Sequence, residues 1–334
     1  MKQPKQESKI KRTLHTQGYR FVGKNSAVKI CNWNKQALRG WGECYKYKFY
    51  GIPSWRCCQM TPNLECDNSC VHCWRPIELD MTDKNKIKGK SKEIDTPEEI
   101  INQCIAEQRK LLIGFGGYDK LNRKRFEESK NPSHFAISLI GEPTLYPKIG
   151  ELVSLLRKQG KTSFIVTNGL HTEILKKLER KKQLPTQLYV SLNSSNKEDY
   201  DKWQNSKLKD AWKRYNKTLD FLNKITKKGK RTVLRMTLVR NKNMSDKNIF
   251  EFAELIKKSS VMFVEVKSYM AIGYSRKRLG YETMPNLKEI EAFAKKLAKA
   301  SGYIVLDKHI ASRIVLLGKN KEARARMKIK KSEI

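Results

Sequence analysis

Short runs of apolar residues alternate along most of the chain with segments in which apolar positions recur every three or four residues. The first pattern indicates buried strands and the second indicates amphipathic helices. The runs predict strands at residues 57–60, 134–140, 163–167, 188–192, 231–239, 261–266 and 303–306. Helices are predicted between them at residues 149–158, 174–178, 207–227, 249–256 and 287–300. Such a series with short connections predicts a parallel sheet, either a barrel or a doubly wound layer.

One further helix has a clear start signal. Thr96 precedes Pro97, and Glu99 lies three residues after Thr96, which is the pattern of a capping box. The apolar face that follows includes Cys104, which we therefore assign to the core. In parallel α/β sheets, functional side chains gather at the carboxyl ends of the strands.

The chain is strongly basic, with 70 Lys and Arg residues against 34 Asp and Glu and a net charge of +36. Such an excess attracts polyanions, and nucleic acid is the commonest of these. No apolar run is long enough for a transmembrane helix, and the polar start of the chain lacks the apolar stretch of a secretion signal. We therefore expect a cytoplasmic protein that binds nucleic acid.

Two loops combine basic and aromatic residues, at 114–132 and 269–287. This combination suits the phosphates and unstacked bases of RNA. Ordinary solvent-facing loops have a similar composition, so the residues alone leave both interpretations open.

Seven of the eight cysteines fall between Cys31 and Cys73, which in a cytosolic chain indicates metal binding before disulfides. Three of them, Cys66, Cys70 and Cys73, have the spacing C-x3-C-x2-C on a loop after a predicted strand. Zinc sites and ordinary iron–sulfur clusters usually take four protein ligands. Three thiolates leave one iron open, as a catalytic metal requires. The spacing predicts such a [4Fe–4S] cluster, with zinc or a structural cluster as the alternative.

This loop resembles that of the radical S-adenosylmethionine (SAM) superfamily. The resemblance implies an α/β fold with a partial (β/α)6 barrel, SAM bound at the open iron, and reductive cleavage of SAM to a 5′-deoxyadenosyl radical. Further residues at predicted strand ends match positions that contact SAM in the superfamily: Gly141, Glu142, Thr167, Asn168 and Ser191. Each of these is equally compatible with turn chemistry. The position before the last cysteine is usually aromatic and near adenine, whereas here it is His72.

A second set of cysteines, Cys31, Cys44 and Cys57, is spaced by thirteen residues each. No local metal motif has this spacing. The residues alone therefore allow either free thiols in the core or a second metal site that forms beside the cluster loop.

Motifs along most of the chain are similar to those of archaeal tRNA 4-demethylwyosine synthases. They are Gly18-Tyr19, Ser26-Ala27-Val28-Lys29, Cys44-Tyr45-Lys46, Lys48-Phe49-Tyr50-Gly51-Ile52, Arg56-Cys57, Gln59-Met60-Thr61-Pro62, Cys73-Trp74-Arg75, Gly114-Phe115-Gly116-Gly117 and Gly141-Glu142-Pro143-Thr144-Leu145-Tyr146-Pro147. The resemblance implies that Cys31, Cys44 and Cys57 bind a second [4Fe–4S] cluster, with the adjacent Cys58 as a possible substitute for Cys57.

The same resemblance assigns Lys46, two residues after the middle cysteine, to a Schiff base with pyruvate. A lysine near a positively charged cluster site can lose its proton and attack a carbonyl. Lys48 is the alternative lysine, and direct chelation of pyruvate by the second cluster is the alternative mode.

The implied reaction joins pyruvate to N1-methylguanosine-37 of tRNA(Phe) and forms the tricyclic base 4-demethylwyosine, a carbon–carbon lyase activity within wybutosine biosynthesis. In it, the adenosyl radical takes a hydrogen from the N-methyl carbon, that carbon adds to pyruvate, and the pyruvate carboxyl carbon is lost before ring closure. Two alternatives stay open: a radical SAM methyl- or methylthio-transferase acting on RNA, and a basic RNA-binding protein with a structural metal.

We divide the chain into a basic N-terminal segment (1–50) that contributes second-cluster cysteines, a radical SAM barrel (51–310) and a basic C-terminal extension (311–334). Eukaryotic relatives carry an N-terminal flavin domain that supplies electrons, and residues 1–50 are too few for one. We therefore expect an external electron donor, and we expect a monomer.

Overall fold

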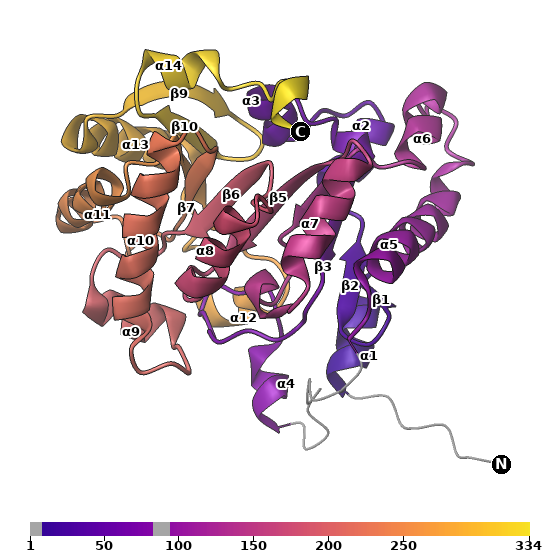
Figure 1. Ribbon diagram of the computed structural model, residues 1–334, viewed down its shortest axis with the longest axis horizontal. Helices are drawn as coiled ribbons and strands as arrows, with labels where there is room; N and C mark the ends of the chain where they lie inside the picture. The colour runs from indigo at the N-terminus through magenta and orange to yellow at the C-terminus, as the bar shows by residue number, and fades with distance from the viewer. Residues whose placement is uncertain (1–8, 83–93) are drawn as a thin grey trace.

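Six adjacent parallel strands form the centre of the computed structural model, which describes residues 9–82 and 94–334. The six are β3 (Cys57–Thr61), β4 (His134–Ile137), β5 (Thr162–Thr167), β6 (Gln187–Ser191), β7 (Thr232–Leu238) and β8 (Phe263–Ser268). Each pairs with the next strand in chain order, and the sheet does not close on itself (Figure 1). The predicted partial (β/α)6 barrel is confirmed.

Helices connect these strands and cover one face of the sheet (Figure 1). The long ones are α5 (Pro97–Leu112), α7 (Ile149–Lys158), α8 (Thr172–Arg180), α10 (Ala211–Lys227), α11 (Asp246–Ser259) and α13 (Leu287–Ser301). Their apolar stripes pack on the strands in one large core, to which Leu152, Leu219 and Ile256 contribute fully buried side chains. The predicted capping box at Thr96 and Glu99 begins α5 as expected. Within the described part of the chain, no helix is both long and apolar enough to cross a membrane.

Antiparallel strands extend the sheet at both edges, which the sequence pattern did not predict. β1 (Arg20–Val22) and β2 (Ser26–Lys29) form a hairpin on β3, while β10 (Ile314–Gly318) pairs with β8 and carries β9 (Ile304–His309) as the outer strand. The strand predicted at 303–306 is therefore present as an antiparallel edge strand. β1 and β2 are only three and four residues long, too short to show a period.

Short helices occupy segments that the sequence pattern left irregular. They are α1 (Lys9–Thr16), α2 (Asn32–Leu38), α3 (Tyr45–Tyr50), α4 (Ile77–Thr82), α6 (Arg123–Ser129), α9 (Lys197–Gln204), α12 (Ser275–Leu279) and α14 (Lys321–Ala325). Both basic loops thus contain a helical turn or two. The side chain of Asn122 caps α6 by accepting a hydrogen bond from the Arg125 amide, a local signal that the charge run obscures.

Strand alternation separates two adjacent cysteines. Cys57 lines a cavity on the inner side of the sheet, whereas Cys58 faces the helices and is fully buried with Cys104 in the main core. The prediction that Cys104 is a core residue is confirmed. Cys58 points away from Cys31 and Cys44, which also line the cavity, and so is not positioned to replace Cys57.

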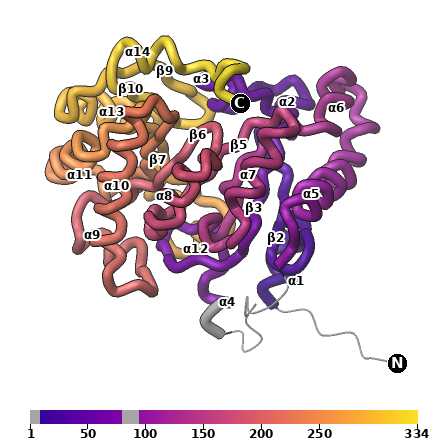
Figure 2. Tube along the Cα trace, in the orientation of Figure 1, coloured from indigo at the N-terminus to yellow at the C-terminus, as the bar shows by residue number. Residues whose placement is uncertain are grey.

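The C-terminal segment packs against the N-terminal helix α3 (Figure 2), with the Ile329 amide bonded to the Tyr50 carbonyl at 3.1 Å. Buried Arg231 anchors it through the carbonyls of Arg326 and Met327 and an ion pair with Glu333. The sequence assigned 311–334 to an extension, and β10 within it is part of the sheet. We keep the three-part division only as a proposal.

Replacing Arg231 with Met should release this segment, because its carbonyls lose their buried donors. We expect a loss of about 1–3 kcal/mol in unfolding free energy, together with faster amide exchange over residues 326–334. Urea unfolding and hydrogen exchange followed by mass spectrometry would measure both. Arg324→Met is the control, since Arg324 donates its bond to the Val305 carbonyl from an exposed position. Unchanged exchange in Arg231→Met would contradict the anchoring role.

Candidate active site

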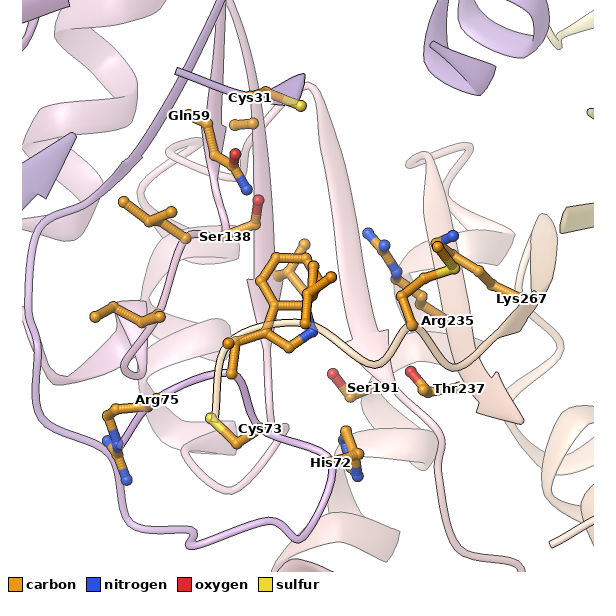
Figure 3. A pocket seen from close by; sticks show the side chains of 18 of the residues that line it. Cys31, Gln59, His72, Cys73, Arg75, Ser138, Ser191, Arg235, Thr237 and Lys267 are labelled. Atoms are coloured by element: carbon orange, nitrogen blue, oxygen red, sulfur yellow. The ribbon is translucent and has the colours of Figure 1, made fainter. Parts of the chain in front are cut away.

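A cavity of about 1100 Å³ lies on the inner face of the sheet (Figure 3). All six parallel strands, or the turns directly after them, contribute side chains to its wall: Gln59, Ser138, Thr167, Ser191, Arg235 and Lys267. The cavity is also lined by both sets of cysteines, one from residues 31 to 57 and the other from the loop after β3. The structure therefore brings all the predicted metal ligands to one space.

The first set lies on the loop after β3, and a distant segment holds this loop by its backbone. The Val71 amide donates to the Trp203 carbonyl at 3.0 Å, and the Lys207 amide donates to the Asp67 carbonyl at 2.8 Å. The Asp67 carboxylate contacts His171 Nε2 at 2.6 Å. The conformation of the loop is therefore held by hydrogen bonds to α9, to the residues that follow α9, and to His171.

A second clamp comes from the segment around α12. Arg278 Nε donates to the Val71 carbonyl at 2.8 Å, and the same guanidinium contacts the Cys73 carbonyl. At Gly273 the backbone φ is +59°, and a Cβ there would lie 2.7 Å from the Trp74 carbonyl oxygen. Arg278 belongs to the basic loop that the sequence associated with RNA, yet its side chain supports the cysteine loop. Basic composition alone could not separate these two roles.

Burial raises the pKa of the Cys66 thiol to about 12 and that of Cys70 well above its usual range, while Arg75 opposes both shifts. Thiolates at these positions therefore need a nearby cation. Among the described residues, no three His, Cys, Asp or Glu side chains converge closely enough to hold one metal ion. A [4Fe–4S] cluster binds each thiolate at a different iron. Three cysteines on one loop fit such a cluster with one open iron, whereas a closed zinc site takes four protein ligands.

Glu142 lies at the centre of the predicted SAM-contact residues and is almost fully buried. Its Oε1 accepts hydrogen bonds from the Thr144 and Thr167 hydroxyls, both at 2.6 Å, and its Oε2 accepts one from the Asn168 amide at 2.7 Å. Burial raises the pKa of Glu142, and these donors oppose the shift. The backbone amide of Glu142 also donates to the Glu65 carbonyl at 2.7 Å, which ties the turn after β4 to the start of the cysteine loop.

The other predicted residues also face the cavity. Asn168 Nδ2 lies 4.0 Å from Cys66 Sγ, and Ser191 lines the wall beside it. His72 lines the cavity near Cys73 and Ser191 (Figure 3), and its Nε2 is 3.2 Å from Asn193 Nδ2. Burial, followed by the charge of Arg278, lowers the pKa of His72 to about 4, so the ring is neutral.

Each cysteine of the second set lies at the start of a helix or a strand. Cys31 is the N-cap of α2, Cys44 is the N-cap of α3, and Cys57 is the first residue of β3. Burial raises the pKa of Cys44 and of Cys57 to about 12, whereas Lys46 lowers both. The three cysteines reach the cavity from the starts of three separate elements, so no short motif in the sequence could show that they line one space.

The two candidate lysines on α3 point in different directions. Lys46 lines the cavity, with its Nζ 5.6 Å from the centre of the Phe164 ring. Lys48 is half exposed, and its Nζ makes an ion pair with Asp307 at 2.7 Å and a hydrogen bond to the Lys308 carbonyl. Of the two, Lys46 alone faces the cysteines.

An open barrel of six parallel strands with this three-cysteine loop defines a radical SAM enzyme, which uses SAM and a [4Fe–4S] cluster. The family model of the radical SAM superfamily matches residues 60–253. A second model, described as wyosine base formation, matches residues 258–319.

Comparison with related proteins identifies the family within the radical SAM enzymes. The chain is 42% identical to the SAM-dependent tRNA 4-demethylwyosine synthase of Pyrococcus abyssi, over 94% of this chain and 90% of the relative. It is 39% identical to that of Methanocaldococcus jannaschii, over 92% and 95%. A solved structure of TYW1 with a lysine–pyruvate adduct bound matches with a TM-score of 0.81 and 35% identity, over 98% of this chain and 99% of that one. The chain belongs to the tRNA 4-demethylwyosine synthase family.

Gly141 allows Glu142 to reach its position, because its φ is +74° and a Cβ would lie 2.1 Å from the Asn63 carbonyl oxygen. We expect Gly141→Ala to cost about 3–5 kcal/mol in unfolding free energy, measured by urea denaturation, and to lower the iron bound after reconstitution. Gly40 has the same φ with nothing within 4 Å, so Gly40→Ala should cost only about 1–2 kcal/mol and keep the iron. Equal losses for the two variants would show that the contact with Asn63 is unimportant.

Proposed function

We propose that the protein condenses N1-methylguanosine-37 of tRNA(Phe) with pyruvate to form 4-demethylwyosine. The observation that carries this proposal is the shared cavity, which has two sets of three cysteines and a lysine, Lys46, in its wall. The family to which the chain belongs favours this activity over methyl or methylthio transfer, the alternative considered from the sequence.

We assign Cys66, Cys70 and Cys73 to the cluster that binds SAM. When bound there, SAM supplies the adenosyl radical that abstracts hydrogen from the substrate. Glu142 would hold the carboxyl ends of β4 and β5 in place for SAM through its bonds to Thr167 and Asn168. Ser191 is available for SAM from the next strand, β6. These roles are supported by the position of the residues in one cavity wall.

We assign Cys31, Cys44 and Cys57 to a second [4Fe–4S] cluster, and Lys46 to pyruvate. In the Schiff base, Lys46 Nζ would attack the ketone carbon of pyruvate, and the carbonyl oxygen would leave as water. The related TYW1 structure that has a lysine–pyruvate adduct supports such a step. Lys48, paired with Asp307 outside the cavity, is a poor candidate for it.

The tRNA substrate is consistent with the basic character of the chain and with the cavity rim. Tyr274, Arg276 and Lys277 line the cavity, and Lys277 Nζ lies 4.6 Å from the centre of the Tyr274 ring. Such a rim suits the phosphates and the unstacked base of an anticodon loop. The external electron donor, the monomeric state and the cytoplasmic location stay predictions.

The function is tested with anaerobically reconstituted protein, SAM, a reductant, tRNA(Phe) carrying N1-methylguanosine-37, and ¹³C-labelled pyruvate. Mass spectrometry of the nucleosides should find two pyruvate carbons in the tricyclic base and none from the carboxyl group. Lys46→Ala should lower the product by at least about a hundredfold, because the covalent anchor is lost. Lys48→Ala should stay within about twofold of the wild type, because an exposed ion pair contributes little. A product without pyruvate carbon would refute the proposal.

The two clusters are tested by iron and sulfide analysis of reconstituted protein. We expect about eight irons in the wild type and about four in each triple variant, Cys66/Cys70/Cys73→Ala and Cys31/Cys44/Cys57→Ala. Cys58→Ala is the control and should keep about eight, since this side chain lies in the core. A wild type with four irons, all lost in the first triple variant, would leave no second cluster.

A further inference from the structure

Two cationic side chains, Arg235 on β7 and Lys267 on β8, line the same side of the cavity (Figure 3). In the register of these strands Arg235 pairs with Glu265, and Lys267 pairs with Thr237. Arg235 and Lys267 are therefore diagonal neighbours on one face of the sheet. The positive charge of Arg235 lies close enough to lower the pKa of Lys267, after the larger effect of burial, to about 8.

The protein supplies only part of the negative charge that this pair requires. Arg235 Nε lies 4.0 Å from Glu265 Oε2, and the other oxygen of Glu265 accepts hydrogen bonds from the Tyr50 and Tyr189 hydroxyls. Lys267 Nζ donates to the Ser312 carbonyl at 2.8 Å, and within the described residues no carboxylate contacts this ammonium group. One carboxylate thus faces two cations. Both cations are partly buried and only partly paired with negative charge, so a bound anion would stabilise this wall.

The pair lies next to the lysine that we assign to pyruvate. The Arg235 guanidinium donates to the Tyr45 hydroxyl at 3.2 Å, and Tyr45 directly precedes Lys46 on α3. Arg235 and Lys267 are also near enough to Cys44 for a thiolate there to favour their charged forms. The second set of cysteines, the Lys46 amine and the two cations therefore surround one part of the cavity.

We infer that Arg235 and Lys267 form a carboxylate subsite that holds the carboxyl group of pyruvate while its ketone carbon meets Lys46. This inference rests on the proposed function and adds a two-point recognition of 2-oxo acids. A guanidinium and an ammonium bind a carboxylate through charge-assisted hydrogen bonds, and the amine selects the adjacent carbonyl. A ketone without a carboxylate can still form the imine with Lys46, but it makes no charge-assisted hydrogen bond to Arg235 or Lys267.

The test measures Schiff-base formation directly, without SAM or tRNA. Reconstituted protein is titrated with pyruvate, the imine is reduced with cyanoborohydride, and the adduct on Lys46 is quantified by peptide mass spectrometry. Lys267→Gln should raise the pyruvate concentration for half-maximal trapping by about tenfold or more, because one charge-assisted bond is lost. Lys267→Arg, which keeps the charge, should stay within about threefold of the wild type. Lys267 is preferred to Arg235 because its removal leaves no buried carboxylate unpaired.

Acetone, a ketone without a carboxylate, is the matched probe, and its trapping should be equal in the wild type and in Lys267→Gln. Lys295→Gln, at an exposed position on α13, is the matched control variant. In turnover assays Lys267→Gln should raise the KM for pyruvate and leave the KM for tRNA unchanged. An unchanged pyruvate titration, an equal loss for acetone, or a rise confined to the KM for tRNA would each overturn the subsite.

Failure of the subsite and failure of the proposed function can be told apart in the wild type. If the wild type traps pyruvate on Lys46 and incorporates its carbons, the function stands and only the role of Lys267 is at issue. If the wild type does neither, the proposed function fails, and the subsite fails with it.

Discussion

The buried carboxylate of Glu142 is the interaction on which the arrangement of the site depends. Glu142 lies in the turn after β4. Its carboxylate accepts hydrogen bonds from Thr167 and Asn168 at the end of β5, and its backbone amide donates to the Glu65 carbonyl, next to Cys66. One residue, through its side chain and its backbone amide, therefore links the turn after β4, the end of β5 and the start of the cysteine loop. The left-handed backbone at Gly141 is what allows this position, since a Cβ there would strike Asn63. The Gly-Glu pair has a structural role before any contact with SAM is considered.

The cysteine loop takes the rest of its order from segments far along the chain. Backbone bonds from the region of Trp203 and the guanidinium of Arg278 hold it from two sides. Because these supports lie beyond β6 and β8, the geometry of the loop depends on segments more than a hundred residues away in the sequence. Loss of either support would be expected to disturb cluster binding without touching a ligand, since outer contacts orient metal-binding residues.

Much of the fold could be predicted because its signals are local. Apolar runs gave the six parallel strands, the capping box gave the start of α5, and the C-x3-C-x2-C spacing gave the first cysteine set. The remainder depends on long-range packing. The edge strands β1 and β2 are too short to show a period. Cys31, Cys44 and Cys57 line one cavity only because the starts of α2, α3 and β3 all face it. Likewise, the different directions of Lys46 and Lys48 follow from α3, because residues two apart on a helix lie on different faces, and the sequence pattern did not predict this helix.

The positive charge of the chain does at least three different things, and composition cannot distinguish them. Arg231 donates hydrogen bonds to carbonyl groups of the C-terminal segment, and Arg278 donates to a carbonyl group of the cysteine loop, so these two charges stabilise the fold. Arg235 and Lys267 are cationic groups in the cavity wall that face one carboxylate, Glu265. Only the solvated remainder, such as Arg276 and Lys277 at the rim, is free to attract a polyanion. The net charge of +36 therefore overstates the charge available to a polyanion, because part of it lies inside the fold, including the two cations of the proposed carboxylate subsite.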